Sequence, residues 1–239
     1  MRSLALRTLY SGCAARRIVR TGGLIVWRPI NEVGYRAGVS AFLATVVFDV
    51  VQLLQVAGAL RSPLDEILIY AASLCIVVPF VVEILALHHL TVGEGRFWAH
   101  AAVVFASIYA IFVSANYVVQ LATVIPAKSI GDAASIALLE QTPHSMFWDY
   151  DAIGYIAMGF ATLFAARAVP RAPANTWVVR ALYANTIVTP LIAFVYFYPR
   201  FSTALLFVGF PWAITAPASM LTLALFLRRQ SPGEPVVPS

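Results

Sequence analysis

The residues best suited to chemistry lie inside apolar stretches that are long enough to cross a membrane. The stretch Gly38–Leu60 carries an acid, Asp49, near its middle, and Gln52 and Gln55 follow it. Steps of three place these side chains on one broad face of a helix. A charged side chain at the centre of a bilayer costs about 2.5–3.5 kcal/mol on insertion scales, so we expect Asp49 to face other helices. We interpret Asp49 as the ionisable centre of a candidate binding site.

Polar side chains at helical spacing recur in later apolar stretches. They are Asn116 and Gln120 in the third stretch, Asp151 and Tyr155 in the fourth, and Asn185, Thr189 and Tyr196 in the fifth. We expect the stripes to converge on a polar pocket in the outer half of the protein, with Asp151 at its mouth. The hydrogen-bonding walls of that pocket would be Gln52, Gln55, Asn116, Gln120 and Tyr155. The alternative is that such side chains only bond neighbouring helices together, at about 0.6 kcal/mol each.

A second acid, Glu83, lies in the second apolar stretch, near two histidines that end the same helix and one that begins the next. Glu83, His88 and His100 are therefore candidates for a proton relay on the inner side. Their spacing matches no recognised metal-ligand motif, so no metal site is predicted. The phosphate-loop, HExxH, CxxC and GxSxG motifs do not occur, and no cofactor is predicted.

The composition requires a membrane. Of the 239 residues, 61% are hydrophobic and 11% are charged, whereas soluble domains carry roughly a quarter charged residues. A membrane-spanning helix needs about 20 mostly apolar residues. The chain provides six such segments, near 38–60, 66–88, 97–124, 147–167, 177–198 and 203–227. The predicted fold class is an all-α integral membrane bundle of six transmembrane helices.

The distribution of positive charge predicts the orientation of this bundle. If the N-terminus is cytoplasmic, thirteen of the sixteen lysine and arginine residues fall on the cytoplasmic side. Cytoplasmic segments of membrane proteins carry such an excess. Both termini are therefore predicted to be cytoplasmic, and the lipid bilayer is the expected partner. The net charge of +5 follows this topology and does not indicate nucleic-acid binding.

The chain divides into three parts. Residues 1–36 form a basic N-terminal arm, residues 37–228 the transmembrane domain, and residues 229–239 a flexible tail. An organellar presequence and an overlong gene start are the alternatives for the arm. Arginine greatly outnumbers lysine, which together with abundant alanine and valine is typical of GC-rich genomes, so we expect a bacterial inner membrane. In the longest loop, Asp132 is expected to cap a short amphipathic helix.

Three stretches also carry a resemblance. SPLDEILIYAASL, FVSANYVVQLATVIP and WDYDAIGYIAMGFATLFAA are similar to segments of a group of uncharacterised bacterial multi-pass membrane proteins. The positions that carry the resemblance are Tyr117, Gln120, Asp151, Gly154 and Tyr155. The resemblance covers most of residues 38–228 and implies a six-helix membrane fold. It implies nothing about activity or substrate.

Three functions are compatible with these patterns. The first is a binding or transport-type membrane protein for a small molecule or ion, with an outward-facing polar pocket. The second is a membrane enzyme that acts on a lipid-like substrate and uses Asp49 or Glu83 as acid or base. The third is a non-catalytic membrane partner whose polar stripes only hold its helices together. The contents and opening of the interior distinguish the three.

Overall fold

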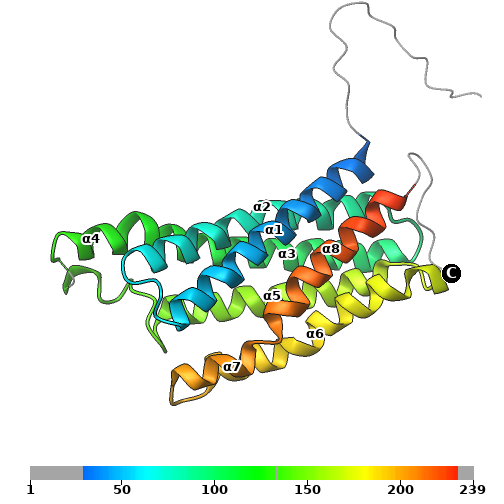
Figure 1. Ribbon diagram of the computed structural model, residues 1–239. Helices are drawn as coiled ribbons and strands as arrows, with labels where there is room; N and C mark the ends of the chain where they lie inside the picture. Colours follow the sequence, from blue (N-terminus) through cyan, green and yellow to red (C-terminus); the bar gives the residue numbers. More distant parts are fainter. Residues whose placement is uncertain (1–28, 133, 231–239) are drawn as a thin grey trace, which may run out of the picture.

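The computed structural model describes residues 29–132 and 134–230, which form helices and the turns between them (Figure 1). The long helices are α1 (Ile30–Val56), α2 (Leu64–Leu90), α3 (Gly95–Val119), α5 (Met146–Ala168), α6 (Thr176–Phe197) and α8 (Trp212–Arg229). The short ones are η1 (Gln120–Val124), α4 (Ile125–Ser129), η2 (Ala134–Ile136), η3 (Pro173–Asn175), η4 (Thr203–Leu205) and α7 (Leu206–Gly209). The predicted all-α bundle is confirmed.

Most of the long helices are apolar enough to lie in a bilayer. Five segments of the described chain are long and apolar enough to cross a membrane: Ile30–Val56, Leu64–Leu90, Gly95–Ser129, Pro173–Phe197 and Thr203–Arg229. The remaining long helix, α5, has 23 residues but contains Asp149, Asp151 and Arg167. The chain therefore has the character of a multi-pass membrane protein. The number of six spans and the side on which the termini lie stay predictions.

The long helices form a circle in which each one packs against its neighbours in the chain, and α8 packs against α1. Figure 1 shows the start of α1 and the end of α8 at the same end of the bundle, which we call the terminal end. The loop that follows α4 lies at the opposite end, which we call the long-loop end. Side chains on the outside of the circle are apolar and exposed, as lipid contact requires.

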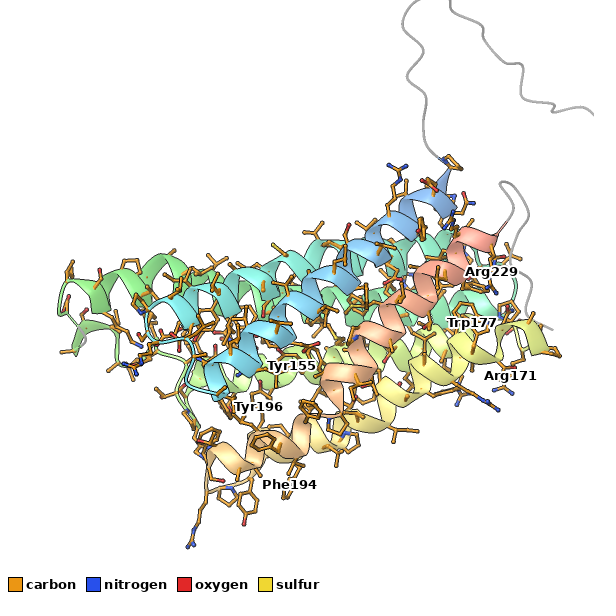
Figure 2. The ribbon with its side chains drawn as sticks, viewed as in Figure 1. Tyr155, Arg171, Trp177, Phe194, Tyr196 and Arg229 are labelled. Carbon is orange, nitrogen blue, oxygen red and sulfur yellow. The ribbon has the colours of Figure 1, made fainter. Side chains whose placement is uncertain are left out.

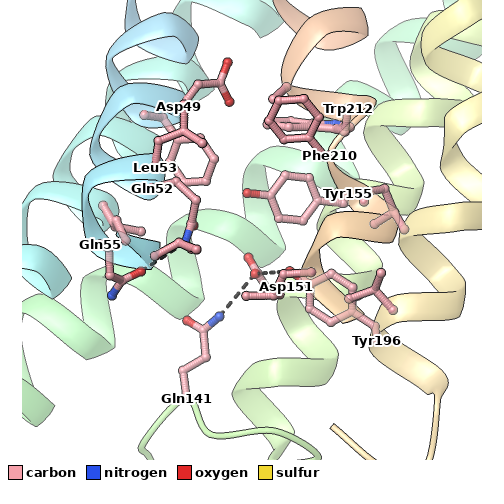
Figure 3. A pocket seen from close by; sticks show the side chains of 18 of the residues that line it. Asp49, Gln52, Leu53, Gln55, Gln141, Asp151, Tyr155, Tyr196, Phe210 and Trp212 are labelled. Atoms are coloured by element: carbon pink, nitrogen blue, oxygen red, sulfur yellow. Dashed lines mark hydrogen bonds between the residues drawn. The ribbon is translucent and has the colours of Figure 1, made fainter. Parts of the chain in front are cut away.

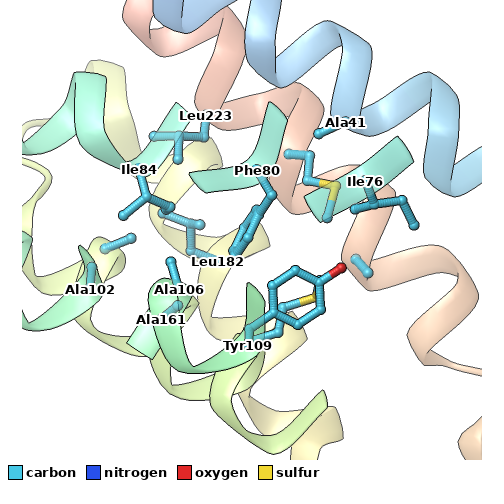
Figure 4. Packing of buried hydrophobic residues seen from close by; sticks show 14 of the residues in the cluster. Ala41, Ile76, Phe80, Ile84, Ala102, Ala106, Tyr109, Ala161, Leu182 and Leu223 are labelled. Carbon is cyan, nitrogen blue, oxygen red and sulfur yellow. The ribbon is translucent and has the colours of Figure 1, made fainter. Parts of the chain in front are cut away.

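The half of the bundle toward the terminal end is tightly packed. Large apolar side chains such as Phe80 and Ile84 on α2 are at most 1% exposed and fill the middle of the circle (Figure 4). Small residues face them from α3 and α5, including Ala102, Ala106 and Ala161, each fully buried. Small residues let membrane helices approach closely, because their backbones can come into contact. This half contains most of the buried core.

The sixth predicted segment, 203–227, differs from the prediction because it is not one helix. It begins with η4 and α7, turns at Phe210 and Pro211, and only then continues as α8. Proline has no backbone N–H and its ring displaces the preceding turn, which explains the break. In Figure 1, α7 lies beside α6 and away from α1. The circle of helices is therefore not closed at the long-loop end.

Two other boundaries differ from the sequence analysis. Helix α1 begins at Ile30, within the predicted arm 1–36, while residues 1–28 of that arm and 231–239 of the predicted tail lie outside the described residues. The prediction of an amphipathic helix after Asp132 is wrong, because only the short segment Ala134–Ile136 is helical there. Backbone groups of that loop bond a side chain of η1 and cannot complete a longer helix.

Arginine side chains cover aromatic rings at the terminal end. The guanidinium of Arg229 lies 5.0 Å from the centre of the Trp177 ring, which joins α8 to α6 (Figure 2). Arg167 lies 5.0 Å from the Trp98 ring in the same way and joins α5 to α3. Such pairs contribute about 0.5–1 kcal/mol at exposed sites. These pairs place both positive charge and aromatic rings at the terminal end of the bundle.

The packing of α5 against α6 supplies a stability prediction. A methyl group added at Gly159 would overlap the Thr189 hydroxyl and lie 2.8 Å from its Cβ. The Gly159→Ala variant is therefore expected to lose about 1–3 kcal/mol of stability, through separation of the two helices. Thermal unfolding in detergent measures this loss. The control is Val78→Ile, which adds a similar volume on the lipid-facing side of α2, where Val78 is 67% exposed; equal midpoints for the two variants would contradict the packing.

Candidate functional site

A cavity of about 370 Å³ lies in the half of the bundle toward the long-loop end (Figure 3). Its walls come from the last turns of α1, the first turns of α2 and α5, and the ends of α3 and α6. The turn between α7 and α8 completes it. Ligand pockets in proteins commonly have volumes of about 300–1,000 Å³. The cavity is therefore large enough for one small organic molecule.

Asp151 on α5 is the most highly bonded side chain of the cavity. Its carboxylate accepts hydrogen bonds from the Tyr117 hydroxyl at 2.6 Å, the Tyr196 hydroxyl at 2.5 Å and the Gln141 amide nitrogen at 3.1 Å. These donors come from α3, α6 and the long loop. The side chain of Asp151 lines the cavity although the residue is only 4% exposed. Three donors satisfy a carboxylate, which has only acceptor atoms when ionised.

Aromatic rings form a continuous wall around this carboxylate. Tyr70 and Tyr117 lie with ring centres 5.2 Å apart, on the side of α2 and α3. On the opposite side Tyr155 packs against Tyr196 at 6.2 Å and edge-on against Trp212 at 4.9 Å. The indole N–H of Trp212 is buried and has no hydrogen-bond partner among the described residues. The wall thus combines aromatic faces with one unused donor.

The α1 side of the cavity carries a second polar group. Gln52 donates to Gln55 at 3.0 Å, and Gln55 donates to Asp65 of α2 at 2.9 Å. Asp49 also lines the cavity and is half-buried, but it makes no hydrogen bond within the described part of the chain (Figure 3). Asp49 therefore offers a free acceptor, whereas the two glutamines are already bonded to each other and to α2.

The long loop is bonded over the cavity as a roof. Gln120, in the π-helical turn η1, donates to the Leu139 carbonyl at 2.8 Å and accepts from the Gln141 backbone N–H at 3.2 Å. Asn116 donates to the Gln141 side chain at 3.0 Å. The wider turn of a π-helix rotates side chains off the regular α-helical stripe and is frequent at functional sites. These bonds position Gln141, which in turn reaches Asp151.

An ion-pair cluster holds the same roof against α2. Lys128 on α4 lies 2.6 Å from Glu140 of the loop and 3.5 Å from Glu66 at the start of α2. Each of these side chains is between 23% and 31% exposed, so water only partly screens the cluster. The roof is therefore fixed both to α3, through amides, and to α2, through charges.

The cavity reaches the surface at the side of the bundle. Its exposed lining residues are all apolar: Leu53 and Val56 on α1, and Phe201, Phe207 and Phe210 in and around α7. They lie on the two sides of the place where the break in the sixth segment leaves the circle open. The polar residues of the lining lie deeper. We call these five apolar residues the rim.

The structure brings together five of the seven predicted pocket residues. The lining includes Asp49, Gln52, Gln55, Asp151 and Tyr155, whereas Asn116 and Gln120 lie behind it and hold the roof. Asp49 was expected at the centre of the pocket and Asp151 at its mouth, but the structure reverses these positions. Asp151 lies at the centre of the hydrogen bonds instead of at the mouth, because donors from three segments converge on it. Asp49 lies at the edge near the rim.

The predicted relay residues lie outside the cavity. His88 and His100 pack together with ring centres 5.4 Å apart. Glu83 is fully buried against Gly38 of α1, and neither carboxylate oxygen has a hydrogen-bond partner among the described residues. No group of three potential metal ligands occurs in the part of the chain that the structure describes. The relay stays a prediction.

Several residues of the site were not among the predicted pocket residues. They are Tyr70, Tyr117, Gln141, Trp148, Tyr196 and Trp212. Tyr196 lies on a recognised polar stripe, at helical spacing from Asn185 and Thr189, and that spacing was the available signal. Gln141 lies in a loop, where no periodicity indicates direction. Aromatic residues near helix ends are also expected at membrane interfaces. Their presence in the sequence therefore did not indicate that they line a cavity.

Comparisons of the chain with protein-family models, with curated proteins and with solved structures found no match. The resemblance to bacterial multi-pass membrane proteins therefore stays a prediction, and the function has to be argued from the cavity itself.

The roof supplies a prediction about local stability. Replacing Gln120 by Ala removes two hydrogen bonds to the loop, each worth about 0.5–1.5 kcal/mol. Amide hydrogen exchange at residues 139–141 is therefore expected to accelerate about tenfold. Gln52→Ala is the matched control, because Gln52 bonds only Gln55 on its own helix. If both variants exchange like the parent protein, the roof does not depend on Gln120.

Proposed function

We propose that the chain is a binding or transport-type membrane protein whose cavity takes up one small amphipathic molecule from the side of the bundle. The observation that carries this proposal is a cavity of about 370 Å³ with polar groups inside and an apolar rim. The buried N–H of Trp212 supports a bound molecule, because a buried donor without a partner costs free energy. The half-buried carboxylate of Asp49 offers a second unused polar group in the lining.

The position of the rim supports entry from the bilayer. The roof covers the cavity at the long-loop end through the bonds of Gln120 and Lys128. The exposed lining is apolar, with Leu53 at 51% and Phe207 at 60%. A molecule with an alkyl or aromatic tail keeps that tail in an apolar environment during such an entry. A fully hydrated solute would instead have to cross an apolar surface.

A membrane enzyme that acts on a lipid-like substrate is the second candidate. One observation favours it: the rim opens sideways next to a carboxylate, Asp49. The donors that surround Asp151 favour binding instead, because they hold that carboxylate as an acceptor. Mass spectrometry of the ligand recovered after incubation separates the two. Unchanged ligand supports binding, and a cleaved or transferred product supports catalysis.

The proposed location is a bacterial inner membrane, with six spans and both termini in the cytoplasm. The excess of arginine at the terminal end supports this orientation through the positive-inside rule. The pair of Arg229 and Trp177 at that end is typical of a membrane interface, where aromatic and basic side chains gather. The long loop, with its roof over the cavity, would then face the outside.

Cysteine labelling tests this orientation. In a variant without Cys13 and Cys75, Ser202→Cys is placed at the long-loop end and Ala174→Cys at the terminal end, both at exposed positions. A membrane-impermeant maleimide added to spheroplasts is expected to label residue 202 and not residue 174, because only the long-loop end faces outward. Detergent lysis serves as the control and should expose both. The reverse pattern in spheroplasts would invert the proposed topology.

Blocking the rim tests the proposed function. Leu53 lines the cavity and Leu54 does not, although the neighbours are 51% and 41% exposed. Leu53→Trp is expected to fill the opening and to weaken the binding of a dodecyl amphiphile about tenfold or more, since it removes the contact surface of the tail. Leu54→Trp adds the same bulk toward lipid and should bind like the parent protein.

Binding is measured with radiolabelled dodecyl compounds that carry cationic, neutral and anionic head groups, on purified protein in a neutral maltoside detergent. The proposal requires saturable binding of at least one compound, with about one molecule per chain. Saturable binding of none would contradict the proposed function. Equal affinity of the Leu53→Trp and Leu54→Trp variants would contradict entry at the rim.

A further inference from the structure

The lining of the cavity has an unbalanced charge. Its carboxylates are Asp49, Glu66 and Asp151, and none of its residues, all of them described, is a lysine, arginine or histidine. Glu66 lies 3.5 Å from Lys128 outside the lining. Asp49 and Asp151 form no ion pair within the described chain, whose ion pairs lie at Glu32, Glu66 and Glu140. The cavity therefore presents two carboxylates without a counter-charge.

The bonds of Asp151 suit its ionised form. Two hydroxyl groups and one amide donate to its oxygens, and these neutral donors solvate a negative charge without cancelling it. Buried charges in proteins are ordinarily paired, because an uncompensated charge in a medium of low dielectric constant is costly. Protein side chains around Asp151 thus provide the solvation, and a cationic ligand would add the opposite charge.

The aromatic wall is suited to the same kind of ligand. Tyr117, Tyr155 and Tyr196 surround the carboxylate, and Trp148 packs against Tyr196 with ring centres 4.6 Å apart. The electron-rich faces of such rings attract cations, and cages of aromatic residues recognise quaternary ammonium groups. An anionic head group would meet two carboxylates and the negative faces of the rings, so the wall disfavours it.

The rest of the cavity lining indicates what kind of tail the ligand carries. The indole N–H of Trp212, on the opposite side from Tyr70, is a buried donor without a partner, and the residue is 7% exposed. Beyond it the rim is apolar, at Leu53, Phe207 and Phe210. A cationic head group next to Asp151 therefore leaves its tail pointing through the rim toward lipid.

We propose that the ligand is an amphipathic organic cation, an alkyl- or arylalkyl-ammonium compound whose head group lies next to Asp151 and the tyrosine wall. This inference rests on the proposed function, because it names the class of molecule that the same cavity takes up. Inorganic cations are less suited, since they prefer several oxygen ligands to aromatic faces.

The test compares head groups on a constant tail. Dodecyltrimethylammonium, dodecyl glycerol ether and dodecyl sulfate are the cationic, neutral and anionic probes, measured on the full-length protein in maltoside detergent. The cation is expected to bind about tenfold or more tightly than the neutral probe, and the anion least. Equal affinity for cation and neutral probe overturns the inference and leaves the proposed function standing. Saturable binding of none of the probes overturns the proposed function itself.

Variants assign the selectivity to residues. Asp151→Asn is expected to reduce the affinity for the cation about tenfold and to affect the neutral probe less, since it removes the counter-charge together with one acceptor oxygen. Tyr155→Leu should reduce the preference for the cation in the same direction while keeping an apolar wall. Asp49→Asn provides a second test that breaks no hydrogen bond, in case Asp151→Asn fails to fold.

Asp149→Asn is the matched control, because Asp149 lies two residues from Asp151 and is exposed outside the lining. It removes the same charge from the protein and should keep the cation preference of the parent. If Asp149→Asn lowers the cation affinity as much as Asp151→Asn does, the selectivity comes from overall charge and the inference is wrong.

Discussion

Burying a carboxylate costs free energy unless it is hydrogen-bonded, and the half of this protein around Asp151 provides those hydrogen bonds. Lipid offers no hydrogen bonds, so every donor has to come from the chain. Tyr117 brings α3, Tyr196 brings α6, and Gln141 brings the long loop to the same pair of oxygens on α5. One acid thus joins the long loop to three helices. A simple apolar core would require none of these contacts.

The two halves of the bundle follow from the size of the residues at the helix contacts. Toward the terminal end, alanine and glycine let the helices approach until Phe80 and Leu87 fill the middle. Toward the long-loop end, Tyr117, Tyr155 and Tyr196 line the cavity, and the hydroxyls of Tyr117 and Tyr196 bond to Asp151 across the interior. Aromatic side chains are rigid, so they hold neighbouring helices apart. The packed half anchors the helices whose other ends surround the cavity.

The sequence predicted the helices and a part of the polar lining, because both depend on local periodicity. Asn185 and Thr189 of the fifth stripe lie outside the lining. Periodicity did not predict the positions of Asn116 and Gln120 correctly. Both lie on the expected face of the helix, but the π-helical turn directs Gln120 toward the long loop and away from the cavity. The role of Gln141 could not be predicted from the sequence, because it depends on how the long loop folds back over the cavity. Asp49 drew attention because it lies mid-span, whereas Asp151, near a helix end, acquires its importance only from tertiary donors.

The break at Phe210 and Pro211 decides whether Asp151 is structural or part of a site. A continuous sixth helix would run beside α1 along its whole length and would enclose the polar interior, and the hydrogen bonds would then only stabilise the bundle. With α7 turned toward α6, the interior meets the surface between apolar side chains at the side of the bundle. Hydropathy does not detect this break, because the residues on both sides of Pro211 are apolar. One proline within an apolar segment therefore leaves a buried carboxylate and its aromatic wall open at the side of the bundle.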